Sequence, residues 1–183
     1  LAASQKAELL LEEKMKEHDS VGGVIECVVK GMMPGIGEPV FEKLDANLAK
    51  AVMTIGAVKG VEIGDGFASA ESFGSSNNDA FCLDQDKHIT KATNHAGGIL
   101  GGISDGSDVI LRAAVKPTPS IAKTQQTVNR DKEPIAIEIG GRHDPIIVPR
   151  AVVVVEAMTA ITVFDMMMES MSSNLDRIKR FFS

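Results

Sequence analysis

Near the middle of the chain, residues 109–120 read VILRAAVKPTPS. The first seven positions are mostly branched or apolar and predict a strand over Val109–Val115. Two prolines follow, and each fixes its own φ and holds the preceding residue extended. Because alternate side chains of an extended segment share a face, Lys116, Thr118 and Ser120 would present one ammonium and two hydroxyls together. Such a set can cradle a phosphate. A proline-stiffened connection between strands is the alternative interpretation.

The hydrophobic pattern on both sides of this stretch predicts a mixed chain of helices and strands. Helical spacing predicts helices over 2–17, 41–55 and 149–171, and β-rich runs predict strands over 24–29, 57–63, 124–128 and 135–139. The opening of the last helix, Val152–Val155, would also suit a strand. Residues 64–86 are rich in Ser, Asn, Asp and Gly and predict a long exposed loop. The sequence therefore predicts an α+β fold in one domain.

Composition excludes several classes of protein. The 183 residues include 25 acidic and 19 basic side chains, a formal charge of −6, and no Trp or Tyr. A general nucleic-acid binder usually has a basic excess and aromatic stacking platforms, so no nucleic-acid partner is expected. No run of 18 apolar residues occurs, and on that ground no membrane span is expected.

The cysteines and the N-terminus indicate the compartment and the origin of the chain. Cys27 and Cys82 are isolated, which predicts neither a disulfide framework nor a zinc site, and no metal ligand set is expected. A reducing, cytoplasmic location follows. The chain begins at Leu1 without an initiator Met or a basic segment, so we expect a piece of a longer protein rather than a signal peptide.

Two further segments carry chemical groups. Residues 94–106 contain five glycines, which either bring bare backbone close to a flat cofactor or phosphate, or form a pair of tight turns. In the stretch GGRHDP (140–145), an extended chain would point Arg142 and Asp144 the same way. The guanidinium would keep the carboxylate ionised or bind an anionic ligand, and an ion pair that pins a turn is the alternative. The acidic residues of the last helix are expected to pair with Arg150 or with a basic group of another chain.

Taken together, these segments resemble the chorismate synthase family. Six motifs occur in the family's order and spacing: DSVGG (19–23), PVFEKLD (39–45), AVKGVEIGDG (57–66), NHAGGILGGIS (94–104), KPTPSI (116–121) and GRHDP (141–145). The resemblance implies that residues 1–183 are a single-domain portion from the C-terminal half of the family's chain. It also implies the family's α+β fold, in which helices are sandwiched between antiparallel sheets.

The family's activity gives the functional expectation. The resemblance implies a lyase of the shikimate pathway that converts 5-enolpyruvylshikimate 3-phosphate to chorismate and phosphate. It implies reduced FMN as cofactor, NADPH as external or intrinsic reductant of the flavin, and a homotetramer. The chain alone is expected to be inactive, because the family's other half completes the active site. A flavin- or phosphate-binding scaffold, or an oligomerisation unit without catalysis, is the alternative.

The resemblance also implies site residues, each at a position that matches the family's motifs. Asp144 would be the catalytic base, and Arg142 would contact both substrate and flavin. The expected FMN contacts are Gly56, Ala57, Gly101, Lys116, Pro117, Thr118, Pro119, Ser120 and Arg142. Gly56 stands where other members often have Asn or Pro, so its contact would be made through the backbone.

Overall fold

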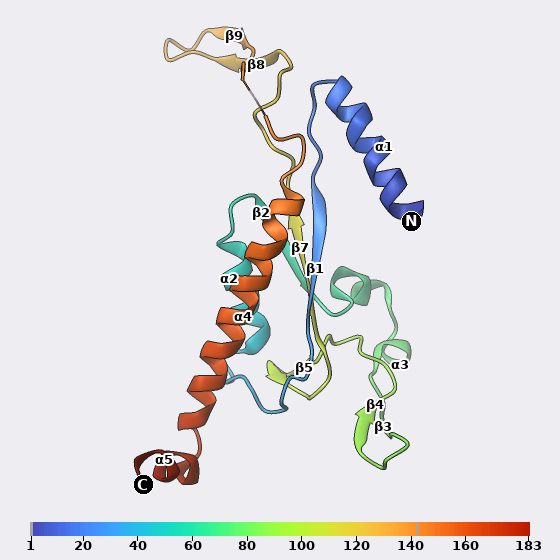
Figure 1. The fold of residues 1–183 in the computed structure, drawn as a ribbon, viewed down its shortest axis with the longest axis vertical. Coiled ribbons are helices and arrows are strands. Elements are labelled where there is room, and N and C mark those ends of the chain that lie inside the picture. Colours follow the sequence, from blue (N-terminus) through green and yellow to red (C-terminus); the bar gives the residue numbers. More distant parts are fainter. Residues whose placement is uncertain (1, 142) are drawn as a thin grey trace.

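A computed structural model describes residues 2–141 and 143–183 of the chain. Figure 1 shows a narrow central body with extensions at both ends. The helices are α1 (Ala2–Lys16), α2 (Leu44–Met53), η1 (Gly66–Glu71), α3 (Gly74–Asn77), α4 (Val148–Ser172) and α5 (Leu175–Phe182). The strands are β1 (Gly23–Val29), β2 (Val58–Ile63), β3 (Phe81–Leu83), β4 (Ile89–Lys91), β5 (Ile99–Leu100), β6 (Ile103–Ser104), β7 (Val109–Val115), β8 (Gln125–Val128) and β9 (Pro134–Ile137).

The central body is built on a three-stranded antiparallel sheet in the order β1-β7-β2. The middle strand is the one that the sequence predicted over Val109–Val115. At one end of the sheet, Val115 lies opposite both Gly23 and Val58. The start of β1, the start of β2 and the end of β7 therefore lie at the same end of the sheet.

Helices α2 and α4 form the other layer of the core. Alternate residues of β7 are buried, as expected for a strand with one face against helices. Helix α2 contributes Leu44, Leu48 and Val52, and α4 contributes Val155 and Met166, all buried. The two helices pack against each other, α2 contacts β2, and α4 contacts β1. The α+β class predicted from the sequence is confirmed.

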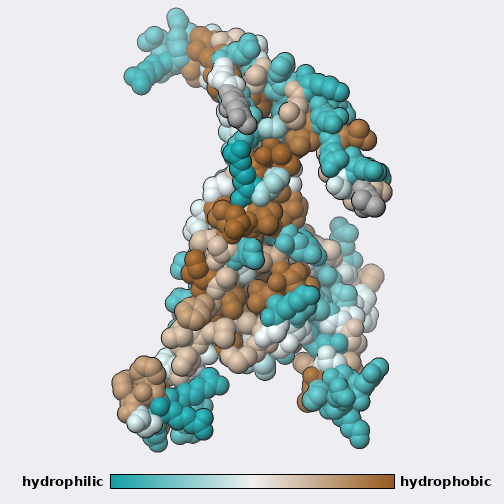
Figure 2. Space-filling view, viewed as in Figure 1, coloured by the Kyte–Doolittle hydropathy of each residue, from teal (hydrophilic) through white to brown (hydrophobic). Residues whose placement is uncertain are grey.

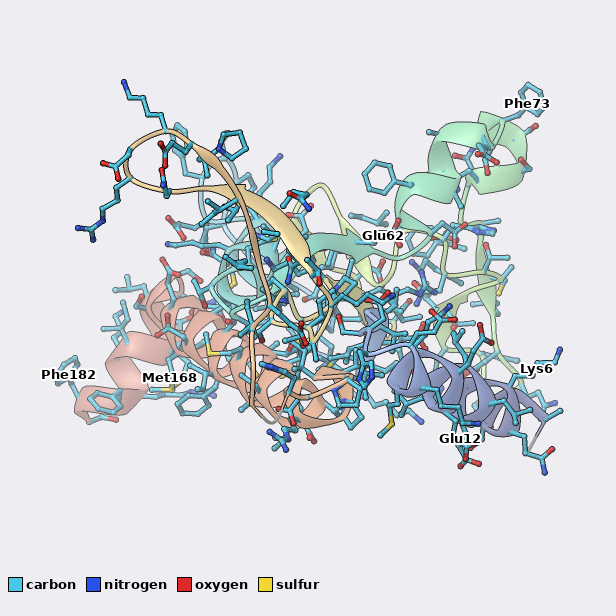
Figure 3. All side chains as sticks on the ribbon, turned by 90° about the horizontal axis from the view of Figure 1, so that it is seen from above. Lys6, Glu12, Glu62, Phe73, Met168 and Phe182 are labelled. Atoms are coloured by element: carbon cyan, nitrogen blue, oxygen red, sulfur yellow. The ribbon has the colours of Figure 1, made fainter. Side chains whose placement is uncertain are left out.

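Several elements lie away from this core. Helix α1 buries none of its residues, and the β8–β9 hairpin projects beyond the sheet (Figure 1). At the other end, Met168 of α4 and Phe182 of α5 line one small apolar cavity (Figure 3). Brown apolar patches are visible over the body in Figure 2, and large side chains such as Val153 and Phe164 of α4 are exposed.

Most predicted elements are present, with corrected bounds. Helix α2 begins at Leu44 rather than near 41, because residues 39–43 form turns. The Val152–Val155 run is helical. The segment 64–86, predicted as a loop, holds η1, α3 and β3, and strand β4 and helix α5 were not predicted.

Helix α4 bears on the expectation that no segment spans a membrane. Its 25 residues are long and apolar enough to cross a membrane by length and composition alone. The search for 18 consecutive apolar residues missed this helix because polar residues interrupt the apolar stretch, although its mean hydropathy stays high. In this fold one face of the helix packs on β1 and α2, and apolar side chains on its other face are exposed.

We expect Leu48→Ala to lower the free energy of unfolding by about 3 kcal/mol, because Leu48 is 0% exposed and its truncation leaves a cavity between α2 and the sheet. Leu9→Ala is the matched control, since Leu9 on α1 is 67% exposed. Urea unfolding followed by circular dichroism measures both. Equal stability of the two variants would contradict the assignment of α2 to the core.

Candidate functional site

The Lys116–Ser120 segment leaves the sheet where β7 ends. The Lys116 backbone N–H donates to the Ala57 carbonyl at 2.9 Å, so the turn Gly56–Ala57 lies beside Lys116. Ala57 has φ +70°, in the left-handed region that a non-glycine residue occupies at a cost. The turn between α2 and β2 is thereby set against the first residue of the predicted phosphate cradle.

The start of β1 packs against the same segment. A Cβ at Gly22 would lie 2.5 Å from the Val115 carbonyl oxygen and 3.1 Å from Pro117 Cδ. The close approach of these two segments of the chain therefore requires glycine at position 22. Two residues before Gly22, Ser20 Oγ donates to the Thr118 carbonyl at 2.7 Å. The DSVGG motif is therefore in direct contact with KPTPS.

Asp144 enters the cluster from the segment before α4. Its Oδ2 accepts a hydrogen bond from Arg150 Nη1 at 2.6 Å, and its side chain is half-buried. The Val21 N–H donates to the Pro145 carbonyl at 2.8 Å, and Val21 pairs with Ile146 in a parallel bridge. The expectation that Arg150 pairs with acidic residues of its own helix is wrong: it binds Asp144, and Glu156 and Asp165 are exposed to solvent.

One small cavity of about 170 Å³ joins these segments. Ser120 and Asp144 both line it, so two residues that the sequence assigned to cofactor and to catalysis face the same space. His18 and His143 also line it, and sequence reasoning had given neither a role. The ring nitrogen His143 Nε2 lies 2.9 Å from the Ile139 carbonyl, which accepts from it and so places the ring proton at Nε2.

The Lys116–Ser120 segment carries hydrogen-bond donors that could bind a phosphate group. Thr118 Oγ1 is buried and has no hydrogen-bond partner among residues 2–141 and 143–183. An unpaired buried hydroxyl is costly, and an anionic ligand would satisfy it. Lys116 is exposed, and its ammonium makes no ion pair within residues 2–141 and 143–183. These residues fit the phosphate tail of a flavin nucleotide.

An ion pair between Lys123 and Asp19 lies next to this cluster. Lys123 Nζ lies 2.6 Å from Asp19 Oδ2 and 3.9 Å from Glu17. The hydrogen bond from Lys123, with help from the Ser20 N–H, holds the pKa of Asp19 below its usual range. The pair ties the chain just after KPTPS to the residues just before β1.

One predicted contact, Gly101, does not join this cluster. Gly101 lies in the tight turn between β5 and β6, with φ +59° and open space at its Cβ position. That hairpin precedes the start of β7, whereas Lys116 follows its end (Figure 1). A seven-residue strand, about 20 Å long, separates them. Arg142 lies outside the described residues.

A second polar cluster lies at the far end of the sheet. Lys91 Nζ is 2.7 Å from Asp105 and 3.3 Å from Asp79, with all three side chains at most 7% exposed. Burial raises the pKa of Asp79, but hydrogen bonds from the Ala96 N–H, the Thr93 hydroxyl, the His95 N–H and Lys91 outweigh it and hold the pKa well below its usual range. This network fixes the glycine-rich segment to the β3–β4 hairpin.

Other side chains near this end have simpler roles. His95 Nδ1 lies 2.6 Å from Asp65 Oδ2, which joins the turn after β2 to the glycine-rich segment. Asp84, Asp86 and His88 at the tip of the β3–β4 hairpin bring potential metal ligands within 4.8 Å of one another, and all three are exposed. The Asp84 carboxylate already accepts from the Asp86 and His88 N–H groups, which is sufficient to explain the grouping.

Comparison with known proteins places these observations in a family. A family model described as chorismate synthase matches residues 1–168. Chorismate synthase of Lachnoclostridium phytofermentans is 61% identical over 182 residues, which cover 100% of this chain and 50% of the relative. That of Archaeoglobus fulgidus is 62% identical over 153 residues, or 83% of this chain and 42% of the relative. A crystal structure of chorismate synthase matches with a TM-score of 0.75 at 30% identity, covering 97% of this chain and 46% of the other. The chain spans about half the length of the curated relatives it matches.

The buried network gives a prediction about stability and pH. Asp79→Asn removes one partner of a buried ion pair and should lower the free energy of unfolding at pH 7 by about 3 kcal/mol. Because the pKa of Asp79 in the folded protein lies below the ordinary carboxyl value of 3.8, the stabilisation is complete above about pH 4 and is lost as the pH falls toward the lowered pKa. The difference between wild type and variant should therefore shrink below pH 4.

Denaturant unfolding at pH 7, 5, 4 and 3 measures this difference. The control is Asp86→Asn, since Asp86 is exposed and its carboxylate binds no other described residue. A difference between Asp79→Asn and wild type that stays constant from pH 7 to pH 3 would contradict the ionised state of Asp79.

Proposed function

The chain belongs to the chorismate synthase family, and from this premise we propose that it supplies a flavin-phosphate cradle and a catalytic carboxylate to that family's reaction. The reaction is the conversion of 5-enolpyruvylshikimate 3-phosphate to chorismate and phosphate. The observation that carries the proposal is that the predicted cofactor-binding and catalytic segments meet at one end of the sheet. There, Ser120 and Asp144 line one cavity, and the Lys116 N–H at the start of the cradle donates to the Ala57 carbonyl, although these residues lie far apart in the sequence.

The cradle would bind the phosphate through groups that no other described residue engages. Lys116 offers its ammonium, Thr118 offers a buried hydroxyl without a partner among the described residues, and Ser120 lines the cavity. Pro117 and Pro119 lack N–H groups and stiffen the segment, so the donors are held in place before the ligand arrives. Positive charge and hydroxyl donors are the groups that recognise a phosphate monoester. Reduced FMN, when bound, supplies transient electron donation to the substrate.

Asp144 is placed to take a proton. Arg150 occupies its Oδ2, which leaves Oδ1 as the oxygen that accepts the proton from the bound cofactor or substrate. The neighbouring pairing of Val21 with Ile146 fixes the backbone on which the carboxylate stands. Arg142, two residues earlier, contacts substrate and flavin in this proposal.

Gly101 can contact the flavin in this proposal only if several copies of the chain assemble. Because the length of β7 separates it from Lys116, Gly101 would approach the flavin held by another copy of the chain. The proposed homotetramer supplies that copy. NADPH as the source of reducing equivalents and a cytoplasmic location complete the proposal, as expected of this biosynthetic step. The alternative, a flavin- or phosphate-binding scaffold without catalysis, shares the cradle but gives Asp144 no role.

The cradle is tested by anaerobic titration of the chain with FMN, followed by absorbance. We expect Lys116→Ala to weaken binding by about tenfold or more, because it removes the cation opposite the phosphate. Lys30→Ala is the matched control, since Lys30 is an exposed lysine beyond the opposite end of β1. Equal affinity of wild type and Lys116→Ala would contradict the cradle.

The catalytic role of Asp144 is tested in a chimera. The matching half of the Lachnoclostridium phytofermentans enzyme is replaced by this chain, and chorismate formation is assayed anaerobically with reduced FMN. We expect turnover by the chimera and a loss of about 10²- to 10⁴-fold on Asp144→Asn, the range for removal of a general base. Asp86→Asn in the same chimera should be unaffected. Retained turnover by the Asp144 variant would favour the scaffold alternative.

A further inference from the structure

Three consecutive residues before β1 each bind a different part of the candidate site. Asp19 pairs with Lys123, Ser20 donates to the Thr118 carbonyl, and the Val21 N–H donates to the Pro145 carbonyl. The Asp19 N–H in turn donates to the Lys14 carbonyl at the end of α1. Residues 19–21, which we call the clamp, therefore join the phosphate cradle to the segment that carries Asp144.

The cradle needs such an anchor because it cannot hold itself in the sheet. Pro117 and Pro119 have no N–H to donate, so the segment cannot extend the ladder of β7. Within the described residues, the polar contacts that hold 117–120 are two: the 2.7 Å bond from Ser20 Oγ to the Thr118 carbonyl, and a longer one of 3.4 Å from Gln125 to the Pro119 carbonyl. Gln125 lies in the projecting β8–β9 hairpin, whereas Ser20 stands next to the central sheet.

The bond from Ser20 acts on the residue that carries the free hydroxyl. Fixing the Thr118 carbonyl fixes the backbone of the same residue, and therefore the direction of the buried Oγ1, which has no partner among the described residues. Ser20 itself is half-buried, so water competes only partly for its hydroxyl. Because Ser20 and Val21 are adjacent, the same short stretch also sets the distance between Thr118 and the backbone next to Asp144.

We propose that Ser20 is a positioning residue, whose hydroxyl holds the Lys116–Ser120 segment in the conformation that binds the flavin phosphate. The proposal deepens the flavin cradle and rests on it. Ser20 touches neither cofactor nor substrate and acts through Thr118. Removing the hydroxyl leaves the fold intact but lets the segment sample other conformations, so binding then requires the segment to be ordered first.

Two readouts test the proposal on the chain itself. Hydrogen exchange by mass spectrometry should show faster exchange of the amides in 116–123 for Ser20→Ala, with the core peptides of β7 and α4 unchanged. Anaerobic titration should show FMN binding about three- to tenfold weaker, the range for loss of one hydrogen bond. Ser20→Thr keeps the hydroxyl and should restore both values. Ser76→Ala, which removes an equivalent hydroxyl-to-carbonyl bond in α3, should change neither.

The outcomes separate this inference from the proposed function. Unchanged exchange at 116–123 in Ser20→Ala overturns the positioning role, whether or not the chain binds FMN. Wild-type affinity in Ser20→Ala, with binding still lost in Lys116→Ala, also overturns it and leaves the cradle standing. A chain that binds no FMN, but in which Ser20→Ala loosens 116–123, overturns the flavin cradle and supports the clamp as a structural contact.

Discussion

The antiparallel register at Val115 is the constraint on which the candidate site depends. Val115 pairs with Gly23 of β1 on one side and with Val58 of β2 on the other. Three segments that are distant in the sequence therefore meet at one end of the sheet. The chain before β1, the turn before β2 and the cradle after β7 must then lie together. Lys116 bonded to Ala57 and Ser20 bonded to Thr118 are direct consequences of that register.

The two ends of the sheet are stabilised in different ways. At the far end, buried charges are fully paired: Lys91 binds Asp79 and Asp105, and further backbone donors satisfy Asp79. At the end that carries the cradle, the Thr118 hydroxyl and the Lys116 ammonium have no polar side-chain partner among the described residues. A buried network with every partner present favours one rigid arrangement, whereas spare donors are a cost unless a ligand uses them.

Much of the fold could be predicted from periodicity and composition. The strand over Val109–Val115, the long helix near 149–171 and the α+β class follow from local patterns, because a half-buried strand and a core helix leave their periods in the sequence. The short elements within 64–91 and helix α5 were missed, since they bury little and leave no such pattern. The membrane-span test on α4 shows the same limit: a long apolar helix looks alike in a core and in a bilayer.

For the site, the sequence by itself determined which groups are present and that KPTPS is rigid, since proline restricts its own backbone and its neighbour's without any tertiary contact. Only the tertiary structure decided how these groups pair. Arg150 binds Asp144 rather than an acid of its own helix, Ser20 anchors Thr118 across 98 positions of sequence, and Gly101 lies a strand's length from the cradle. These pairings depend on strand register and helix packing, which are properties of contacts between distant segments and are not encoded in any one of them.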